Sequence, residues 1–384
     1  MSTAAGEASA GDAFPRDASP RAGAGWLTAP SRLGGLDLAR GLAVLGMLAA
    51  HLLAIDDFEW TRPATWTDVV NGRSSILFAT AAGVSIALVT GGPTPPGEDA
   101  ARGARARLAV RAAVIWIIGI ALVLTGVPVF VILPAYAVLF LLALPLLRLT
   151  APVLWAIAAA TALVMPWLQP TFDALAVWQG ATGSDLALLL GWHYPFPVWF
   201  AYLAAGLAAG RSDLRRVRTQ VALLAGGALA AGAAYGAEAL SPPVLTASTV
   251  WTADAHSQGI LEVIGSGGFA LAVIGAALLL CRTPLAWAVL PLRAVGAMPL
   301  TAYVGQIVAW ALAAGIVLGD TSDLGGFRAL HPLGAFVTTT LVLCTAWALL
   351  RGRGPMERLV TWVTRLAGPR RGVRRGPFAQ EWPG

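Results

Sequence analysis

The first long apolar segment of the chain carries three polar side chains whose spacing suits chemistry. Arg40 and His51 are eleven residues apart, and Asp37 precedes Arg40 by three. In a helix, eleven residues make three turns plus about 20°, so the guanidinium and the imidazole share one face, about 16 Å apart along the axis. A guanidinium binds anions, and an imidazole serves as a general base near neutral pH. The alternative is an Asp37–Arg40 ion pair at the helix end and a structural histidine between helices.

The segment that follows His51 is rich in acidic, amide and tryptophan side chains. It reads DDFEWTRPATWTDVVNGRSS from residue 56 to 75 and includes Asp57, Asp68 and Arg73. Such a segment suits recognition of a hydroxylated or amino-bearing acceptor, for example a sugar. We expect Asp57 or Asp68 to orient His51 as a carboxylate partner, the arrangement that tunes a general base. The alternative is a solvated loop with tryptophan anchors at a membrane surface.

Further polar side chains occur later in the chain. His256 and Glu262 lie near the start of one apolar run, and Tyr303 and Gln306 lie inside another. Polar groups within a membrane are costly and often functional, so these four and Arg73 are predicted to line an acceptor pocket. For Tyr303 and Gln306 the alternative is hydrogen bonding between packed helices. The four histidines and two cysteines show no metal-ligand spacing, so we expect no metal site.

The composition indicates which elements must position these residues. Of the 384 residues, 57% are hydrophobic and 12% are charged, and the mean hydropathy is +0.71. Because soluble domains carry about 25% charged residues, the composition argues against a soluble enzyme, a disordered scaffold and a nucleic-acid-binding domain. All basic residues are arginine, which together with abundant alanine and glycine is typical of a GC-rich bacterial genome.

Apolar runs close to the roughly 20 residues needed to cross a bilayer follow one another along the chain. Because lipid cannot satisfy backbone polar groups, such runs form helices. We predict an all-α, polytopic membrane helix bundle of about ten transmembrane helices within a domain at 32–350, preceded by a disordered tail at 1–31 and followed by a basic tail at 351–384. The expected spans are 34–55, 74–92, 107–126, 128–147, 150–168, 195–210, 219–240, 263–281, 296–318 and 333–350.

The placement of arginine predicts the orientation of the chain. With ten spans and the N-terminus inside, all 26 basic residues except Arg62, Arg73 and Arg328 fall on or beside cytosolic segments. Positive charge is retained on the cytosolic side, so both tails are expected in the cytosol and the protein in a bacterial plasma membrane. The run RRGVRR at 370–375 is placed to contact anionic lipid headgroups of the bilayer. We expect no nucleic-acid partner. The sequence is compatible with a homo-oligomer.

Four short blocks of the chain resemble a known family. Residues Arg32 to Met47 fit R-x-x-x-LD-x-x-RG-LAVLGM, and GRSSILFATAAGVS, HSQGILEVIG and VGAMPLTAYVGQ follow at 72–85, 256–265 and 295–306. These blocks are similar to bacterial membrane proteins with a heparan-alpha-glucosaminide N-acetyltransferase catalytic-type domain and to the related YeiB-like proteins. The resemblance implies a membrane acyltransferase. Such an enzyme moves an acetyl or other acyl group from cytosolic acetyl-CoA or another acyl-CoA to an extracytoplasmic sugar or other hydroxyl or amine acceptor.

The spacing of Arg40 and His51 also resembles an R-x10-H pattern in acyltransferases that O-acylate surface polysaccharides. On that comparison His51 is catalytic and Arg40 lies near the coenzyme. The coenzyme phosphates are then expected near Arg40 and near Arg102, Arg105, Arg107 or Arg111, and Asp37, Arg105 and Arg111 are assigned to this site together with Arg40.

The chain departs from the family in the first outer loop. The lysosomal enzyme has its proposed active histidine there, whereas this chain has Pro63-Ala64-Thr65-Trp66. Either His51 takes that role, or the chain has kept the fold and lost the chemistry. A transporter or lipid-handling protein is the main alternative function, because midplane polar groups and broken helices are also expected of carriers. A non-catalytic assembly or sensor protein is the remaining alternative.

Overall fold

The computed structural model describes residues 24–29, 31–59, 61–246 and 248–366, and within these ranges all regular structure is helical. Eight helical segments are long and apolar enough to cross a bilayer, which confirms the predicted all-α, multi-pass architecture. One of them joins the 3-10 helix η1 (Pro63–Val70) to α3 (Arg73–Val89). The others are α2 (Gly34–Leu52), α4 (Glu98–Val123), α6 (Ala151–Asp173), α9 (Val217–Leu240), α11 (Ile260–Leu280), α14 (Pro299–Val317) and α16 (Leu333–Arg351).

The other two expected spans, the fourth and the sixth, correspond to shorter helices. The fourth is α5 (Leu133–Leu142), which has 10 residues and continues into the 3-10 helix η2 (Leu144–Arg148). Pro145 explains the break, because proline has no N–H to donate and clashes with the preceding turn. The sixth is α8 (Phe196–Arg211), with 16 residues. Both helices are largely buried, and a short helix is tolerated where protein rather than lipid surrounds its ends.

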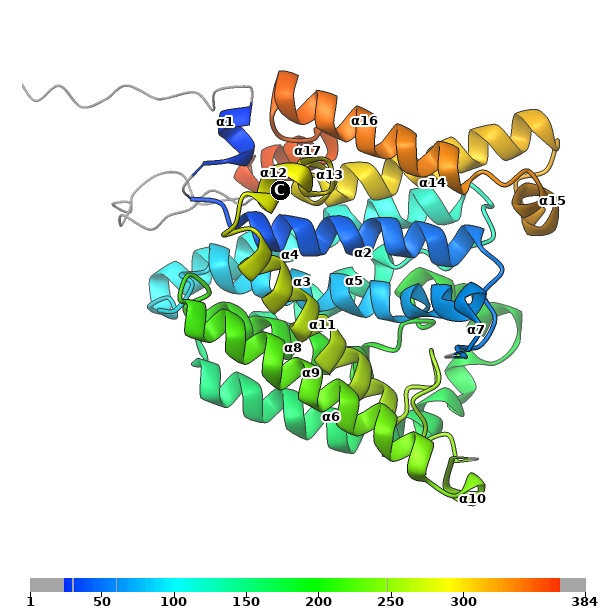
Figure 1. Ribbon diagram of the computed structural model, residues 1–384, viewed down its shortest axis with the longest axis horizontal. Helices are drawn as coiled ribbons and strands as arrows, with labels where there is room; N and C mark the ends of the chain where they lie inside the picture. The colour runs from blue at the N-terminus through cyan, green and yellow to red at the C-terminus, as the bar shows by residue number, and fades with distance from the viewer. Residues whose placement is uncertain (1–23, 30, 60, 247, 367–384) are drawn as a thin grey trace, which may run out of the picture.

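Helix α2 lies at the centre of the bundle. It contacts α3, α11, α14, α16 and the short helix α13 (Leu290–Ala297), and most of its 19 residues are buried. Figure 1 shows α6, α8, α9 and α11 on one side of α2 and α14 and α16 on the other. The helix that carries Asp37, Arg40 and His51 is therefore held from several sides.

A glycine contact fixes α2 against α13. Gly41 of α2 faces the backbone of Leu292, and Gly296 of α13 faces the backbone of Asp37. A Cβ atom on either glycine would overlap these backbone atoms, so only glycine permits the two helices to approach so closely. The contact therefore sets the position of Asp37 and Arg40 within the bundle.

Parts of both predicted tails are helical. In the first, α1 (Ala24–Leu27) packs against α13 and α16, and Trp26 and Leu27 are buried. In the second, α17 (Pro355–Leu366) packs against α4 and α14 and buries Glu357, Val360 and Thr364. Their spacing of three and four residues places them on one helix face. Residues 1–23 and 367–384, which include RRGVRR, lie outside the described residues.

Short helices make the remaining connections. They are η3 (Ala176–Trp178), α7 (Gly180–Leu190), α10 (Pro243–Thr246), α12 (Leu285–Ala288) and α15 (Leu324–Ala329).

Candidate functional site

Asp37 lies between two arginines at one end of α2, termed here the Arg40 end. Its carboxylate accepts hydrogen bonds from Arg32 at 3.0 and 3.1 Å and from Arg40 at 3.3 Å. Asp37 and Arg40 are only 3% and 5% exposed. Because a buried charge is costly unless it is paired, the carboxylate stabilises Arg40 in a position where water cannot. The structure thus contains the expected Asp37–Arg40 pair and extends it with Arg32.

Arg40 also faces a cavity of about 70 Å³, termed the Arg40 cavity. Its guanidinium donates a hydrogen bond to the hydroxyl of Ser85 on α3, and Arg111 of α4 lines the same cavity. Two of the predicted coenzyme residues therefore share one cavity. Arg105 lies outside its lining and donates to the backbone carbonyl of Leu144 at 3.2 Å. The other lining residues are Phe78, Ala82, Ile86, Ile115, Leu133, Tyr136, Phe140, Pro299 and Leu300.

Glu357 of α17 is a counter-charge at this end that the sequence pattern did not predict. It is 2% exposed, and its carboxylate accepts hydrogen bonds from the backbone N–H groups of Leu300 at 2.8 Å and Thr301 at 3.1 Å and from the Thr301 hydroxyl. It therefore caps the N-terminus of α14, and its charge also acts on Arg40 and Arg111. Burial raises the pKa of Glu357, against the opposing effect of these hydrogen bonds.

His51 lies near the opposite end of α2, termed the His51 end. It lines a small cavity of about 10 Å³ together with Tyr303, Gln306 and Trp310 of α14. Arg328 of α15 donates hydrogen bonds at 2.8 and 3.1 Å to the backbone carbonyl of His51. The backbone at this end of α2 is thus held by a guanidinium, while the imidazole faces the cavity, termed the His51 cavity.

The structure does not bring Asp57 or Asp68 to His51. Asp57 is exposed to solvent, and the carboxylate of Asp68 accepts hydrogen bonds from Arg73 at 3.1 Å and Asn71 at 3.2 Å. Among the described residues, no carboxylate forms an ion pair with the His51 ring. A guanidinium is a stronger partner for a carboxylate than a neutral imidazole is, which explains why Asp68 pairs with Arg73.

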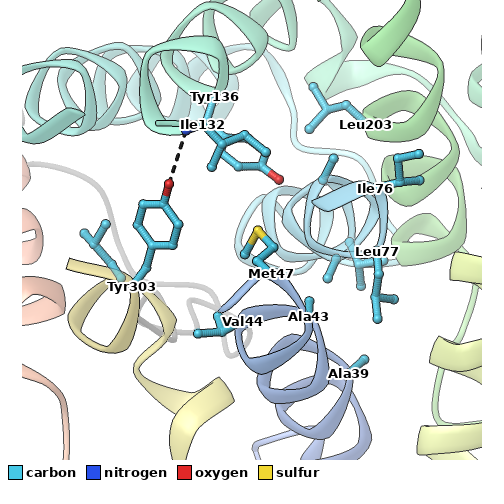
Figure 2. Packing of buried hydrophobic residues seen from close by; sticks show 14 of the residues in the cluster. Ala39, Ala43, Val44, Met47, Ile76, Leu77, Ile132, Tyr136, Leu203 and Tyr303 are labelled. Carbon is cyan, nitrogen blue, oxygen red and sulfur yellow. Dashed lines mark hydrogen bonds between the residues drawn. The ribbon is translucent and has the colours of Figure 1, made fainter. Parts of the chain in front are cut away.

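A layer of packed side chains separates the two cavities. Tyr136 lines the Arg40 cavity, whereas Met47 and Tyr303 line the His51 cavity. Figure 2 shows these side chains packed with Val44 and Ile132 in the core. The Tyr303 hydroxyl accepts a hydrogen bond from the Ile132 amide at 3.3 Å, which links α14 to the start of α5 across these side chains, termed the Tyr303 layer.

A polar cluster lies beside α2 at the His51 end. Arg73 donates to Asp68 and, at 2.9 Å, to the hydroxyl of Tyr235 on α9. Asn71 donates to Asp68, and its own side-chain oxygen lies 3.3 Å from His256 Nε2. Residues that are far apart in the sequence are therefore joined into one network, and His256 is also an electrostatic neighbour of His51.

Glu262 organises the loop that carries His256. Its carboxylate accepts hydrogen bonds from the backbone N–H groups of His256 at 2.7 Å and Gln258 at 2.6 Å and from the Ser257 hydroxyl at 3.2 Å. His256 and Gln258 have φ angles of 68° and 60°, a conformation that residues other than glycine seldom adopt. The carboxylate therefore holds a strained turn that directs the His256 ring toward Asn71.

The residues predicted to line one acceptor pocket fall into two groups at the same end of the bundle. Arg73, His256 and Glu262 belong to the polar cluster, and Tyr303 and Gln306 line the His51 cavity. Among the described residues, no three His, Cys, Asp or Glu side chains are grouped as a metal ion would require.

Comparison with known proteins identifies the family. Residues 32–241 match the family described as heparan-alpha-glucosaminide N-acetyltransferase, catalytic, and residues 209–367 match a second one, described as a protein of unknown function, DUF418. No curated protein and no solved structure shows significant similarity to the chain. The first match covers more than half of the 384 residues and includes Asp37, Arg40 and His51, which confirms the predicted resemblance. The chain therefore belongs to the family of heparan-alpha-glucosaminide N-acetyltransferase catalytic domains.

Proposed function

We propose that the chain transfers an acyl group from cytosolic acetyl-CoA, or another acyl-CoA, to a hydroxyl or amine acceptor on the opposite side of a bacterial plasma membrane. The observation that carries the proposal is the placement of α2, which presents Arg40 to one cavity and His51 to another across the Tyr303 layer. Membership of an acetyltransferase family supports acetyl-CoA as the donor. The arginine-rich segments at the Arg40 end support a cytosolic location for that end.

The phosphates of the coenzyme are assigned to the Arg40 end. Arg40 and Arg111 both face the Arg40 cavity, and the N-terminus of α14 adds partial positive charge beside it. Asp37 fixes the orientation of the Arg40 guanidinium through their hydrogen bond. Arg105 precedes Arg111 by six residues on α4, about 9 Å closer to the membrane surface, where it can contact a phosphate.

Coenzyme binding at this end requires the Arg40 cavity to enlarge. The Arg40 cavity has a volume of about 70 Å³, which is too small for a coenzyme. Glu357 already supplies negative charge to Arg40 and Arg111, so coenzyme phosphates would compete with it for the same cations. Displacement of α17 from α4 and α14 would remove this competing carboxylate.

His51 is assigned the role of general base. Its imidazole accepts the proton of the acceptor hydroxyl or amine while the acceptor oxygen or nitrogen attacks the thioester carbonyl carbon. A carbon–oxygen or carbon–nitrogen bond forms, the carbon–sulfur bond breaks, and the departing thiolate takes the proton from the imidazolium. In the alternative route, His51 itself carries the acyl group between donor and acceptor. Either route requires the Tyr303 layer to open so that donor and acceptor meet.

The acceptor is assigned to the His51 end. The polar cluster there offers the carboxylate of Asp68, the guanidinium of Arg73 and the imidazole of His256. Such groups suit a hydroxylated or amino-bearing acceptor. No carboxylate pairs with the His51 ring among the described residues, so the imidazole is available to an acceptor hydroxyl or amine.

A transporter is the second candidate function. Two separate cavities with packed side chains between them are also what a carrier with alternating access requires. The two functions differ in one measurable respect, because a carrier moves its substrate without consuming acyl-CoA.

Binding and turnover of acyl-CoA by the purified protein test the proposal. Acetyl-CoA is titrated into the protein in nanodiscs, and release of free coenzyme A thiol is followed separately. We expect binding and slow thiol release in the wild type, weaker binding in Arg111→Ala, and wild-type binding in the control Arg215→Ala, since Arg215 is exposed and lies outside the Arg40 cavity. Failure to bind any acyl-CoA would overturn the proposal and favour transport.

A further inference from the structure

A groove with a volume of about 630 Å³ runs between α14 and α16. On the α14 side it is lined by the small residues Ala302, Gly305, Ala309 and Ala313, which are spaced three or four apart and so share one face. Small residues at this spacing usually let two helices pack closely. Here α16 does not fill the space they leave, and the volume is that of a ligand site. The lining on the α16 side includes Ala335, Phe336, Thr339, Thr340, Leu343, Cys344 and Trp347.

The groove opens toward the bilayer. Both α14 and α16 are membrane-spanning by length and hydropathy, and Leu343, which lines the groove, is 62% exposed. From Thr301 to Ala313 the groove extends about 18 Å along α14, more than half of the roughly 30 Å hydrocarbon thickness. An apolar groove of this length, open sideways within a membrane, has the shape and polarity of a lipid chain.

One polar side chain joins the groove to the His51 cavity. Gln306 is 6% exposed and lines both spaces. Its amide nitrogen donates to the Thr340 hydroxyl at 3.3 Å, and its carbonyl oxygen accepts no hydrogen bond among the described residues. Since Gln306 lines both spaces, a ligand hydroxyl or amine in either one can donate a hydrogen bond to this oxygen.

Aromatic rings connect the groove to His51 at the end near α15. Phe336 lines the groove and meets Phe327 edge to face at 5.9 Å between ring centroids, and Phe327 stacks on Trp310 at 4.9 Å. Trp310 also lines the His51 cavity. Arg328, the residue after Phe327, donates to the backbone of His51. A lipid whose chain entered the groove from this end would place its headgroup at the level of His51.

We propose that the acceptor is a membrane lipid, with one chain in the groove between α14 and α16 and with a headgroup hydroxyl or amine at Gln306 and His51. This inference rests on the proposed acyl transfer and names its acceptor class. The acyl carbon leaves the thioester sulfur and bonds to the headgroup oxygen or nitrogen. The proton of that headgroup passes through His51 to the coenzyme thiolate.

Photolabelling tests whether a lipid chain occupies the groove. The full chain is placed in nanodiscs that contain phosphatidylethanolamine with a diazirine at the end of one chain, and crosslinked peptides are mapped after irradiation. We expect label on α14 and α16 above that on the lipid-facing helix α6, which does not line this groove. Equal labelling of the three helices would overturn the proposal.

A matched pair of variants makes the test specific. Gly305→Leu with Ala309→Leu narrows the middle of the groove, and no atom lies within 4 Å of a Cβ at Gly305, so the backbone need not move. We expect photolabelling of α14 and α16 to fall about tenfold, the loss expected when two methylene groups are kept out of an apolar site. Gly315→Leu, on the same helix but outside the groove, should label as the wild type does, because a Cβ there meets only a Thr321 methyl at 3.8 Å.

An activity measurement separates this inference from the function on which it rests. Radioactive acetyl transfer from acetyl-CoA is measured to phosphatidylethanolamine and, in parallel, to the water-soluble amine glucosamine. We expect the groove variant to lose transfer to lipid and Gly315→Leu to keep it, with equal thermal stability of both proteins. Undiminished transfer to lipid in the groove variant, or transfer to glucosamine alone, would overturn the lipid acceptor while acyl transfer stands. Lipid labelling without any consumption of acetyl-CoA would overturn the acyl transfer itself, and with it the acceptor.

Discussion

The two ends of α2 hold their polar groups in different ways. At the Arg40 end, Asp37 binds two arginines, and Glu357 caps α14 beside the cavity that Arg40 and Arg111 line. At the His51 end, by contrast, Arg328 holds the backbone of His51, and the carboxylates of the polar cluster bind other partners. One end is a network of paired charges, and the other is an imidazole in a mainly apolar cavity.

This difference assigns different tasks to the two ends. The guanidinium groups of a network that is already oriented need little reorientation when one anion replaces another beside them. A base without a fixed carboxylate partner depends on its substrate to complete the geometry, and catalytic hydrogen bonds commonly tighten only in the complex. The Arg40 end is therefore suited to hold the donor and the His51 end to perform the proton transfer.

The largest expected effect is an all-or-none difference in accessibility between the two ends. After replacement of the free cysteines Cys281 and Cys344, single cysteines are introduced as Thr67→Cys and Arg215→Cys, both at exposed positions. A membrane-impermeant maleimide applied to intact cells should label position 67 and leave position 215 unlabelled until the cells are lysed, because arginine-rich segments stay in the cytosol. Labelling of position 215 in intact cells would reverse the assignment of donor and acceptor sides.

The second prediction concerns His51. A general base contributes roughly 10²–10⁴-fold to the rate, so His51→Gln should lose about that much acetyl transfer while it binds acetyl-CoA as the wild type does. Glutamine replaces one hydrogen bond but cannot exchange a proton. Turnover is measured with acetyl-CoA and compared with His331→Gln, the same substitution at an exposed histidine outside the His51 cavity, which should turn over as the wild type does. Wild-type turnover in His51→Gln would remove His51 from the mechanism and make His256 the next base to examine.

Much of the fold follows from the sequence, because an apolar run must be long enough to cross the bilayer and must form a helix there. The apolar runs predict the eight long helical segments. The two other predicted spans correspond to the shorter helices α5 and α8. Proline ends α5 at a position that hydropathy alone does not mark. Helix α8 is short because other helices surround it, and the sequence does not state which runs are surrounded by protein.

The candidate site is predictable only where one helix carries it. The spacing of Arg40 and His51 is a local property of α2. Both residues lie on that helix, toward its opposite ends. Glu357 occurs in the segment predicted to be a basic tail. The spacing of Glu357, Val360 and Thr364 indicates one helix face, but it does not show which helices that face contacts. Its role depends on the N-terminus of α14, which is a tertiary contact.

The third prediction tests whether the Arg40 network binds the coenzyme. Arg40→Lys should weaken acetyl-CoA binding about tenfold, the effect of losing one charge-assisted hydrogen bond, because lysine lacks the planar fork of the guanidinium. Binding is measured by titration, with Arg215→Lys as the matched exposed control. If Arg40 served only to neutralise Asp37, Arg40→Ala and Asp37→Ala would each lower thermal stability, the double variant would recover part of it, and Arg40→Lys would bind as the wild type does.

The smallest expected effect is a difference in how the two ends respond to pH. Burial raises the pKa of Glu357 and lowers the pKa of His256. An acid whose pKa is raised in the folded state contributes stability at pH values below its ordinary pKa and loses it as the pH rises through the raised value. A base whose pKa is lowered contributes stability above its ordinary pKa of about 6.5 and loses it as the pH falls through the lowered value. The Arg40 end should therefore weaken on the alkaline side and the His51 end on the acidic side.

Thermal unfolding of two amide variants between about pH 4 and 8 measures these opposite trends. Relative to the wild type, Glu357→Gln should gain stability as the pH rises, because the amide keeps an acceptor for the Leu300 N–H and carries no charge to bury. His256→Gln should gain relative stability as the pH falls, because the amide does not take up a proton. Glu59→Gln, at an exposed glutamate, is the control and should follow the wild type at every pH. Parallel pH profiles for Glu357→Gln and His256→Gln would show that these two groups do not distinguish the ends, and the contrast would then rest on Asp37, Arg40 and His51 alone.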